Sequence, residues 1–383
     1  MIYADNAATT AINPKALEAM LPFMTQCFGN ASSTHEMGQR ASQAMTKARM
    51  AIARCLGASP HEISFTSGGT ESDNQAILSA AALGRNTCKT HIITSAFEHH
   101  AVLNTMKKLE TDGFEITYLD IHSDGVIRPE QIAEHITPST CLVSVMAANN
   151  ETGTIQPVAE IGGICRRHHV IFHTDAVQAV GHIPVDVHEQ QIDMLSMSAH
   201  KFGGPKGIGV LYARKDIPLI NLLEGGSQER GKRPGTENIP AIVGMAAALE
   251  DACERMDESQ KYLIPLRNRL TDELLKLPGA ILNGDYDKRL PGHINFCFQG
   301  GNSESMLLLL NQQGICASAG SACTAGSMEP DHVLLALGRS PELAGTSLRL
   351  TLSESITPND IDVIVQAVTD TLRIIQNDCF ANQ

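Results

Sequence analysis

Short runs rich in β-branched residues alternate with longer amphipathic stretches through the first two-thirds of the chain. This order predicts βαβ units, because parallel neighbours in a sheet must be joined by a crossover, which is usually a helix. We therefore expect an α/β fold with a mostly parallel central sheet. The predicted strands are 91–94, 115–119, 141–146, 170–173, 193–197 and 208–213, and the predicted helices are one that begins at Asn13-Pro14 and others over 40–56, 70–83, 100–110 and 158–168.

The chain changes character near residues 225–240, a stretch too rich in glycine and charge for a buried element. Beyond it, strands and helices follow one another without the earlier alternation, which predicts a smaller α+β domain. We assign residues 16–250 to a large domain and residues 1–15 and 251–383 to a small domain. The later elements are predicted as a helical region to about residue 278, strands over 294–298 and 347–352, and helices over 303–313 and 358–375.

Composition narrows the partners and the location of this 383-residue chain. Lysine plus arginine number 29 against 42 acidic residues, a formal charge of −13, which argues against direct binding to a nucleic-acid backbone. The first residues, MIYADNAATT, lack the basic start and apolar core of a secretory signal, and no apolar run reaches the ~18 residues of a membrane span. The ten cysteines show no metal-like spacing, so we expect no metal and a cytoplasmic protein with mostly reduced cysteines.

Polar and titratable residues follow four of the predicted strands. In an open parallel sheet, ligands bind beyond the carboxyl ends of the strands, so residues in these places meet at one edge. Four occurrences in register predict a single site there. The residues are Glu98 and His99 after strand 91–94; Asn149, Asn150 and Glu151 after 141–146; Asp175 and Gln178 after 170–173; and Ser198, His200 and Lys201 after 193–197.

Three features near this edge match the needs of pyridoxal 5'-phosphate (PLP), which requires a lysine for its aldehyde, an acid against its pyridinium nitrogen and a cradle for its phosphate. Lys201 supplies the amine and Asp175 the acid. The segment 67–72, which includes Gly69 and Thr70, offers glycines and the free N–H groups of a helix start to a phosphate. Each feature alone has an ordinary alternative, namely a solvated loop lysine, a helix cap and a capped helix start. Their combination favours a PLP site.

Three further residues carry chemistry. His99 can stack on a flat ring or shuttle protons, although a lone histidine is more often structural. Arg349 lies inside the apolar run SLRLTL, where a buried guanidinium needs an anion, either a substrate carboxylate or an internal salt bridge. Cys323 lies among small residues that we expect to form a mobile exposed loop over 317–328, which suits a sulfur carrier that visits two places. The alternative for Cys323 is an incidental exposed thiol, and Cys316 is expected to be a packing residue.

Taken together, the motifs resemble a known family. The chain is similar to the cysteine desulfurases of the IscS/NifS-like group, which belong to the class V aminotransferase family and to the fold-type I PLP-dependent transferases. The similarity covers nearly the whole chain, from YADNAATT (3–10) to the last helix. Its most specific pieces are TSGGTESDN (66–74), EHHAV (98–102), NNETG (149–153), HTDAVQ (173–178), SAHKFGGPKGIG (198–209), RPGTEN (233–238) and SAGSACTAGSMEP (318–330).

The resemblance implies conversion of L-cysteine to L-alanine, with transfer of the sulfur to a persulfide on Cys323. Lys201 would hold PLP through a Schiff base and remove the α-proton of the substrate, His99 would stack on the ring, and Asp175 would pair with the pyridinium nitrogen. The remaining implied contacts are Gln178 at the ring hydroxyl; Gly69, Thr70, Ser198 and His200 at the phosphate, joined by Thr236 from the second subunit of a homodimer; and Asn150 and Arg349 at the substrate carboxylate.

The resemblance also implies a sulfur-acceptor protein as a partner, either an iron–sulfur scaffold or a tRNA-thiolation enzyme. The chain ends at NDCFANQ, without the longer tail that often contacts the scaffold in similar housekeeping members, so both acceptors stay open. A selenocysteine lyase or an aminotransferase of the same fold would not need a cysteine on a long mobile loop. A catalytically silent binding protein would be expected to lack at least one of Lys201, Asp175, His99 and Cys323.

Overall fold

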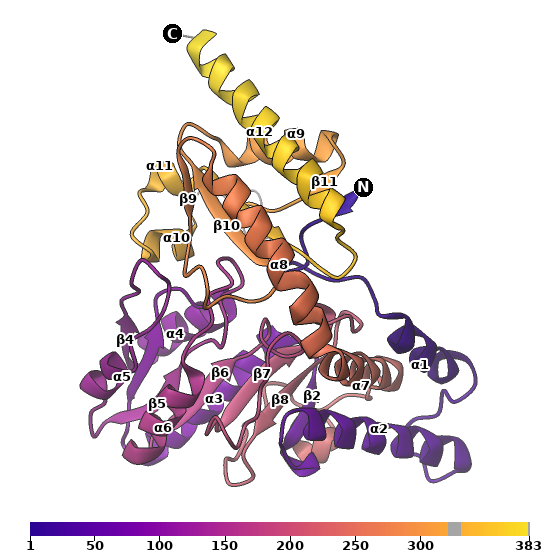
Figure 1. The fold of residues 1–383 in the computed structure, drawn as a ribbon. Helices are drawn as coiled ribbons and strands as arrows, with labels where there is room; N and C mark the ends of the chain where they lie inside the picture. Colours follow the sequence, from indigo (N-terminus) through magenta and orange to yellow (C-terminus); the bar gives the residue numbers. More distant parts are fainter. Residues whose placement is uncertain (321–330, 382–383) are drawn as a thin grey trace.

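The computed structural model describes residues 1–320 and 331–381 (Figure 1). Its largest sheet has the strand order β2-β8-β7-β6-β5-β3-β4. Strand β8 pairs antiparallel with β2 and β7, and the other neighbours pair in parallel, which confirms the predicted mostly parallel sheet. The strands are β2 (Ile63–Thr66), β3 (His91–Ser95), β4 (Glu115–Leu119), β5 (Thr140–Ser144), β6 (Ile171–Asp175), β7 (Met194–Ser198) and β8 (Gly209–Ala213).

Helices cover both faces of this sheet. On one face Ile92 and Leu142 share a hydrophobic cluster with α3 and α4, and on the other face their chain neighbours Ile93 and Val143 pack with α2, α6 and α7. Successive strand residues point to opposite faces, so strands that are apolar throughout must be covered on both. The helices of this part are α1 (Pro14–Thr25), α2 (Glu36–Cys55), α3 (Gly69–Asn86), α4 (His100–Thr111), α5 (Pro129–His135), α6 (Val158–His168) and α7 (Ile239–Glu254).

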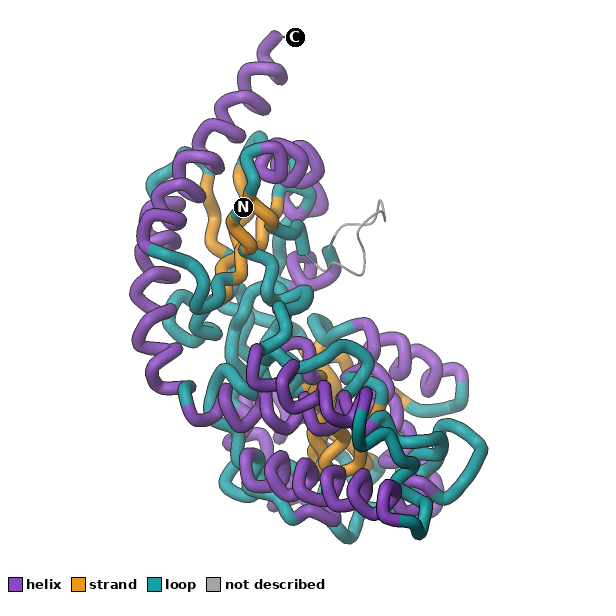
Figure 2. Tube along the Cα trace, turned by 90° about the vertical axis from the view of Figure 1, so that its right-hand side faces the viewer, coloured by secondary structure: helices purple, strands orange, loops and turns teal. Residues whose placement is uncertain are grey.

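A second, smaller sheet lies above the first one in Figure 1 and is separate from it in Figure 2. Strand β10 (His293–Phe298) pairs antiparallel with β9 (Ala280–Leu282) and β12 (Ser347–Thr351). One face of this sheet shares a hydrophobic cluster of its own with the helices of this part. The domain boundary near residue 250 stays a prediction. The helices here are α8 (Met256–Leu275), α9 (Ser303–Gln312), α10 (His332–Ala336), α11 (Pro341–Ala344) and α12 (Pro358–Ala381).

The N-terminal segment connects the two sheets. Strand β1 (Ile2–Tyr3) pairs with β11 (Ile315–Cys316) beside the smaller sheet. The Ala7 N–H then donates to Thr351 Oγ1 (2.8 Å), and the Thr10 N–H donates to the carbonyl of His200 (3.0 Å), just after β7. Residues 7–10 therefore pass over the carboxyl ends of the parallel strands, where the sequence predicts the site.

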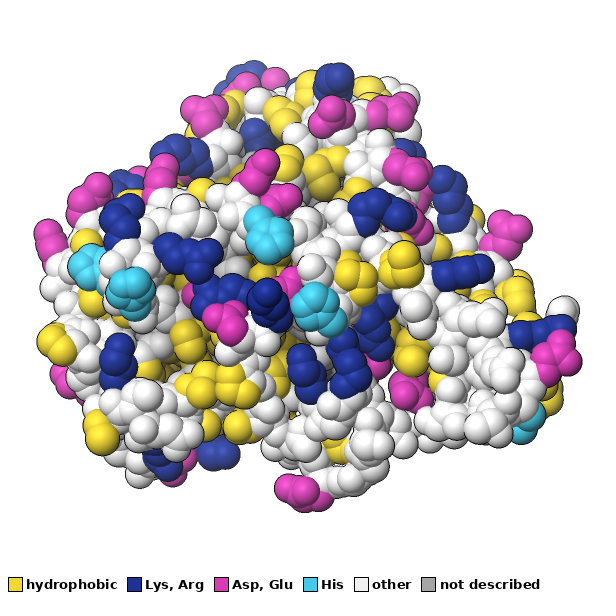
Figure 3. Space-filling model, turned by 90° about the horizontal axis from the view of Figure 1, so that it is seen from below, with side chains coloured by type: hydrophobic (Ala, Val, Ile, Leu, Met, Phe, Trp, Pro, Cys, Tyr) yellow, Lys and Arg dark blue, Asp and Glu magenta, His cyan; other side chains and the backbone are white. Residues whose placement is uncertain are grey.

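Strand β2 was not predicted from the sequence. It has four residues, ISFT, too few for an alternating pattern to stand out, and it gains its place by pairing with β8. Among the described residues, no helix is long and apolar enough to cross a bilayer. The net charge of −13 also hides local variation, because Figure 3 shows lysine and arginine side chains gathered near the middle of one face.

Candidate active site

A cavity of about 210 Å³ lies at the carboxyl ends of the parallel strands. It brings together nearly all of the predicted site residues, from both sheets and from the loops between them. Glu98 and Asn149, which also follow strands, do not line it but are fully buried, where Glu98 accepts from the Met146 N–H (3.0 Å). The predicted residues that line the cavity are Gly69, Thr70, His99, Asn150, Asp175, Gln178, Ser198, His200, Lys201 and Arg349.

Lys201 projects into this cavity from a short 3₁₀ turn, η2 (Ala199–Lys201), directly after β7. Its Nζ donates to the carbonyl oxygens of Ala7 (2.5 Å) and Ala8 (3.0 Å) in the N-terminal segment. Lys206, only five residues later, is exposed. The two lysines of the motif thus differ in environment, and the amine of Lys201 is the one positioned to meet an aldehyde in the cavity.

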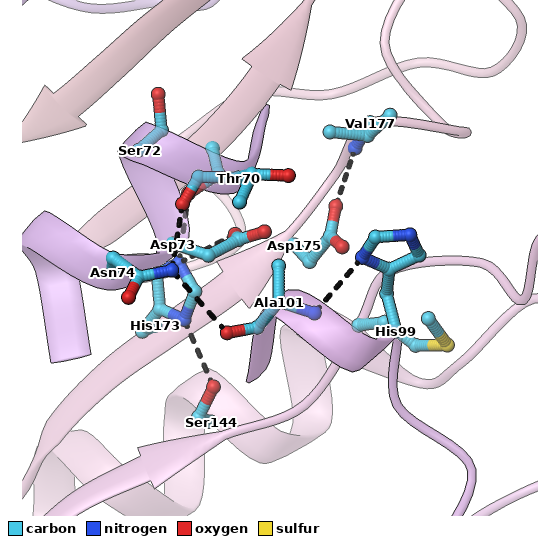
Figure 4. A network of polar contacts seen from close by, with 12 residues as sticks. Thr70, Ser72, Asp73, Asn74, His99, Ala101, Ser144, His173, Asp175 and Val177 are labelled. Carbon is cyan, nitrogen blue, oxygen red and sulfur yellow. Dashed lines mark hydrogen bonds and ion pairs between the residues drawn. The ribbon is translucent and has the colours of Figure 1, made fainter. Parts of the chain in front are cut away.

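Asp175 ends β6 and is buried against the cavity (Figure 4). Its Oδ1 accepts a hydrogen bond from the Val177 N–H (2.9 Å). Burial raises the pKa of this carboxyl, while the nearby His99 and Lys201 act in the opposite direction. His99 caps α4 by accepting from the Ala101 N–H at Nδ1 (3.1 Å), which fixes the ring beside the acid. An acid and a flat ring thus share one wall of the cavity.

A second wall is formed by the start of α3 and the end of β7. A Cβ atom added to Gly69 would lie 2.6 Å from Val177 Cγ2, so only glycine leaves the backbone this close. The free N–H groups of this 18-residue helix and the hydroxyls of Thr70 and Ser198 border the same space. Burial, together with the charge of Lys201, lowers the pKa of His200 to about 4, so its imidazole is neutral at pH 7. This wall has the donors that an anion such as phosphate requires.

Arg349, on β12, lines the cavity from the smaller sheet. Its Nη2 donates to Asp5 (2.9 Å) and its Nη1 to the carbonyl of Asn150 (3.2 Å). The buried Nε has no hydrogen-bond partner among the described residues. The salt bridge considered as an alternative for this arginine is therefore present, and one buried donor is left over. A buried donor without a partner costs free energy in the folded protein.

Three groups at the site were missed from the sequence. Asp73 lines the cavity from α3, Asp5 pairs with Arg349, and the Ala7 carbonyl accepts from Lys201. Asp73 lies in the motif TSGGTESDN, but a helix was predicted there, so no role at the site was assigned to this residue. Asp5 and Ala7 lie in YADNAATT, which has neither a helix nor a strand pattern. That absence of periodicity was the signal that could have indicated a role for this segment at the site. None of the three follows a strand of the sheet.

Two further predicted residues are Cys323 and Thr236. Cys323 belongs to residues 321–330, outside the described residues. The chain enters that segment beside the cavity, because the Ser318 N–H donates to the carbonyl of Arg349 (3.1 Å), and leaves it at His332, which contacts the carbonyl of Glu98 (2.9 Å). Thr236 is exposed and borders a different cavity, near β2. The structure of one chain therefore does not bring Thr236 to Lys201.

An amine, a buried acid and an anion cradle converge in one cavity, and these are the three groups that PLP requires. The cavity is also lined by an arginine, Arg349, whose guanidinium suits the carboxylate of an amino acid. The fold and the cavity thus define a fold-type I PLP-dependent enzyme.

Comparison with known proteins narrows this class. Residues 2–364 match the aminotransferase class-V family. The chain is 49% identical to cysteine desulfurase IscS of Methanosarcina thermophila, over 98% of this chain and 93% of that protein. It is 46% identical to a cysteine desulfurase of a Nostoc species, over 97% and 92%. A solved NifS-like protein superposes with a TM-score of 0.91 at 38% identity, over 97% and 99% of the two chains. A structure described as SspA in complex with cysteine has a TM-score of 0.82, also at 38% identity, over 92% and 99%.

The chain belongs to the class-V aminotransferase family and, within it, to the PLP-dependent cysteine desulfurases. This membership confirms the predicted resemblance, the fold class and the PLP cofactor. The roles of individual residues stay predictions.

Proposed function

We propose that this chain converts L-cysteine to L-alanine and passes the sulfur to the thiol of Cys323, from which an acceptor takes it. The observation that carries the proposal is the convergence of Lys201, Asp175 and Arg349 in one cavity. A PLP aminotransferase needs the same three groups but no thiol carrier, so the proposal also depends on Cys323, whose segment begins and ends beside this cavity.

The cavity residues divide into cofactor-binding and substrate-binding groups. Lys201 would bind the PLP aldehyde, Asp175 would face the ring nitrogen, and His99 would lie against the ring. Gln178, whose Nε2 donates to the Ala7 carbonyl (3.0 Å), would keep its amide oxygen for the ring hydroxyl. The phosphate would be bound by Gly69, Thr70, Ser198 and His200, and the substrate carboxylate by Asn150 and Arg349.

Lys201 would also move the α-proton of L-cysteine. Its Nζ would act as a base and then as an acid at the same atom. PLP supplies the electron sink that makes the substrate α-proton removable and its C–S bond breakable. The Ala7 and Ala8 carbonyls would hold the released amine close to the substrate.

Cys323 would react in its thiolate form and take up the substrate sulfur. Its Sγ attacks the substrate sulfur, a new S–S bond forms as the substrate C–S bond breaks, and the electron pair stays on the substrate carbon, which takes up a proton. Cys323 then carries a persulfide, and the substrate leaves as alanine. Reduction or transfer of the outer sulfur returns the thiol.

The experiment that tests the proposal is an assay of PLP-loaded protein with L-cysteine and a thiol reductant. Alanine and sulfide are expected in equal amounts over many turnovers. Alanine formation without sulfide would contradict the sulfur-transfer step. Keto-acid formation in place of alanine would contradict the assignment in favour of an aminotransferase.

Replacing Arg349 tests whether this arginine binds the substrate carboxylate or only forms an internal salt bridge with Asp5. Replacing it with Lys removes the planar pair of donors, so KM for L-cysteine is expected to rise about 10- to 100-fold, from a loss of about 1.5–3 kcal/mol. The matched control is Asp5→Asn, which breaks only the ion pair. Steady-state kinetics would contradict the substrate role if Asp5→Asn raised KM as much as Arg349→Lys.

We also propose a homodimer in which Thr236 reaches the partner's cavity. Leu17, Leu21 and Met24 are exposed along one face of α1, with the spacing of adjacent helix turns, and Thr236 is exposed too. Light scattering is expected to give twice the 41.1 kDa of one chain. Leu21→Asp should lower this mass, while Leu308→Asp, an equally exposed leucine on α9, should not. A mass of one chain for the unmodified protein would contradict the dimer.

The sulfur acceptor is proposed to be an iron–sulfur scaffold or a tRNA-thiolation enzyme, in the cytoplasm. The eight cysteines whose side chains the structure describes are free thiols, which supports a reducing compartment. The formal charge of −13 supports a protein partner over direct contact with nucleic acid.

A further inference from the structure

Asp73 is a buried carboxyl at the site that the proposed mechanism does not use. It lies in the first turns of α3, its side chain is 1% exposed, and it borders the cavity next to Asp175 (Figure 4). One carboxyl oxygen of Asp73, one of Asp175 and one ring nitrogen of His99 all lie within 4.8 Å of one another. Two carboxyls this close in a buried place repel each other strongly if both are ionised.

The two carboxyls have unequal surroundings. Asp175 accepts a hydrogen bond from the Val177 N–H, which stabilises its ionised form. Asp73 Oδ1 has no hydrogen-bond partner in the described part of the chain, and the nearest ring nitrogen, Nε2 of His173, is 3.6 Å away. Asp73 also has some support, because a hydrogen bond from Ser196 lowers its pKa, but burial and the charge of Asp175 outweigh that contribution.

His173 does not compensate for a charge on Asp73. It lies on β6 and is fully buried, with Nδ1 bonded to the Ser144 hydroxyl (2.9 Å) and Nε2 to the Ser196 hydroxyl (3.0 Å). Burial lowers its pKa to about 3, so the ring is neutral at pH 7. The chain Ser144–His173–Ser196 is therefore a neutral wall behind Asp73.

The other titratable groups around the pair also favour a neutral Asp73 and an ionised Asp175. Burial and then the charge of Asp175 raise the pKa of Asp73 well above its usual range, and Glu98, in the loop before α4, adds to this. Burial also raises the pKa of Asp175, but His99 and Lys201 across the cavity oppose that rise. When the surroundings make the pKa values of two neighbouring acids unequal, the acid with the higher pKa keeps the proton.

We propose that Asp73 and Asp175 form a carboxyl pair that holds one proton, that Asp73 carries this proton, and that Asp175 is the acid left ionised for the ring nitrogen of PLP. The last clause rests on the proposed role of Asp175. The first two concern the protein without cofactor, so they can fail or succeed independently of the desulfurase mechanism.

The test is an infrared titration of the cofactor-free, full-length protein. Burial raises the pKa of Glu98 to about 8, so Glu98 also contributes a protonated-carboxyl band at pH 7. The titration is therefore made in a Glu98→Gln background, where a band is still expected at pH 7 and Asp73→Asn should remove it. The matched control is Glu71→Gln on the same helix: burial opposes its ionisation, but hydrogen bonds from Arg233 and Ser67 keep its pKa below the usual range, so the band should stay. A protonated-carboxyl band that survives when Asp73→Asn is combined with Glu98→Gln would overturn the proposal.

A second variant keeps Asp73 and therefore does not depend on the folding of Asp73→Asn. Asp175→Asn removes the neighbouring negative charge, so the midpoint of the Asp73 band should move to lower pH by at least about one unit. An unchanged midpoint would show that the two acids do not interact and would overturn the pair.

PLP binding then tests which of the two acids carries the charge. Asparagine resembles a neutral acid, so Asp73→Asn is expected to bind PLP within about threefold of the unmodified affinity and to keep its absorbance spectrum across pH 6–9. Asp175→Asn is expected to weaken PLP binding at least about tenfold, the loss for one charge pair worth about 1.4 kcal/mol. Equal losses in the two variants would show that Asp73 contributes its own charge, contrary to the proposal.

Discussion

Replacing Cys323 with alanine is expected to abolish sulfide and alanine formation from L-cysteine, with a loss of at least about 10³-fold in kcat, as is usual when a nucleophile is removed. The physical reason is that the substrate sulfur would lose its proposed acceptor thiol. Among the described cysteines, none lines the cavity. PLP binding should be unchanged, because Lys201 and the phosphate wall do not involve this residue.

The matched control for this substitution is Cys316→Ala. Cys316 lies on β11, half-buried and paired with β1, and is close in sequence to Cys323. Its variant should turn over within about twofold of the unmodified enzyme. Trapping with an alkylating reagent after one turnover, followed by mass spectrometry, should find the extra sulfur on Cys323. Full activity in Cys323→Ala, or a persulfide on another cysteine, would contradict the carrier role.

Replacing Lys201 with alanine is expected to remove both the covalent link to PLP and the proton-transfer base, with a fall in kcat of about 10²–10⁴-fold from the lost base alone. Asp175 and the start of α3 remain, so some PLP should still bind without a covalent bond. Borohydride reduction and mass spectrometry should attach PLP to residue 201 in the unmodified protein and leave the variant unlabelled.

Lys215→Ala is the matched control, because Lys215 is exposed and follows β8. Strand β8 runs antiparallel to its neighbours, so its carboxyl end points to the opposite edge of the sheet from the cavity. Reductive labelling of Lys201 should therefore be unchanged in Lys215→Ala. A labelled Lys201→Ala protein would show that another lysine holds the cofactor and would contradict the assignment.

Much of the large sheet was predictable because its signals are local. The runs HIIT and EITYL each became a strand of five residues, β3 and β4, and the helix expected over 158–168 is α6. The turn chemistry is also local, as Asn13-Pro14 shows by capping α1. Strand β2 and the reversed direction of β8 were not predictable in this way, because both depend on which strand lies alongside.

The site residues also divide into those that local sequence signals predict and those whose importance depends on tertiary packing. Lys201, Asp175 and His99 were found because each follows a strand, and parallel strands bring their carboxyl ends to one edge whatever the loops do. Asp73 was missed because its relevance comes from burial next to Asp175. Sequence position says nothing about that distance, and a carboxyl in the first turns of a helix is ordinary on an exposed surface.

The sequence by itself determined the α/β class, the PLP chemistry and the membership of the cysteine desulfurases, since residue type and order along the chain are enough for these. Only the tertiary structure decided that the Ala7 and Ala8 carbonyls hold the Lys201 amine and that Asp5 shares Arg349 with the cavity. These contacts join residues more than 190 positions apart in the chain. Their energies depend on burial and distance, which a chain acquires only when its distant segments pack together.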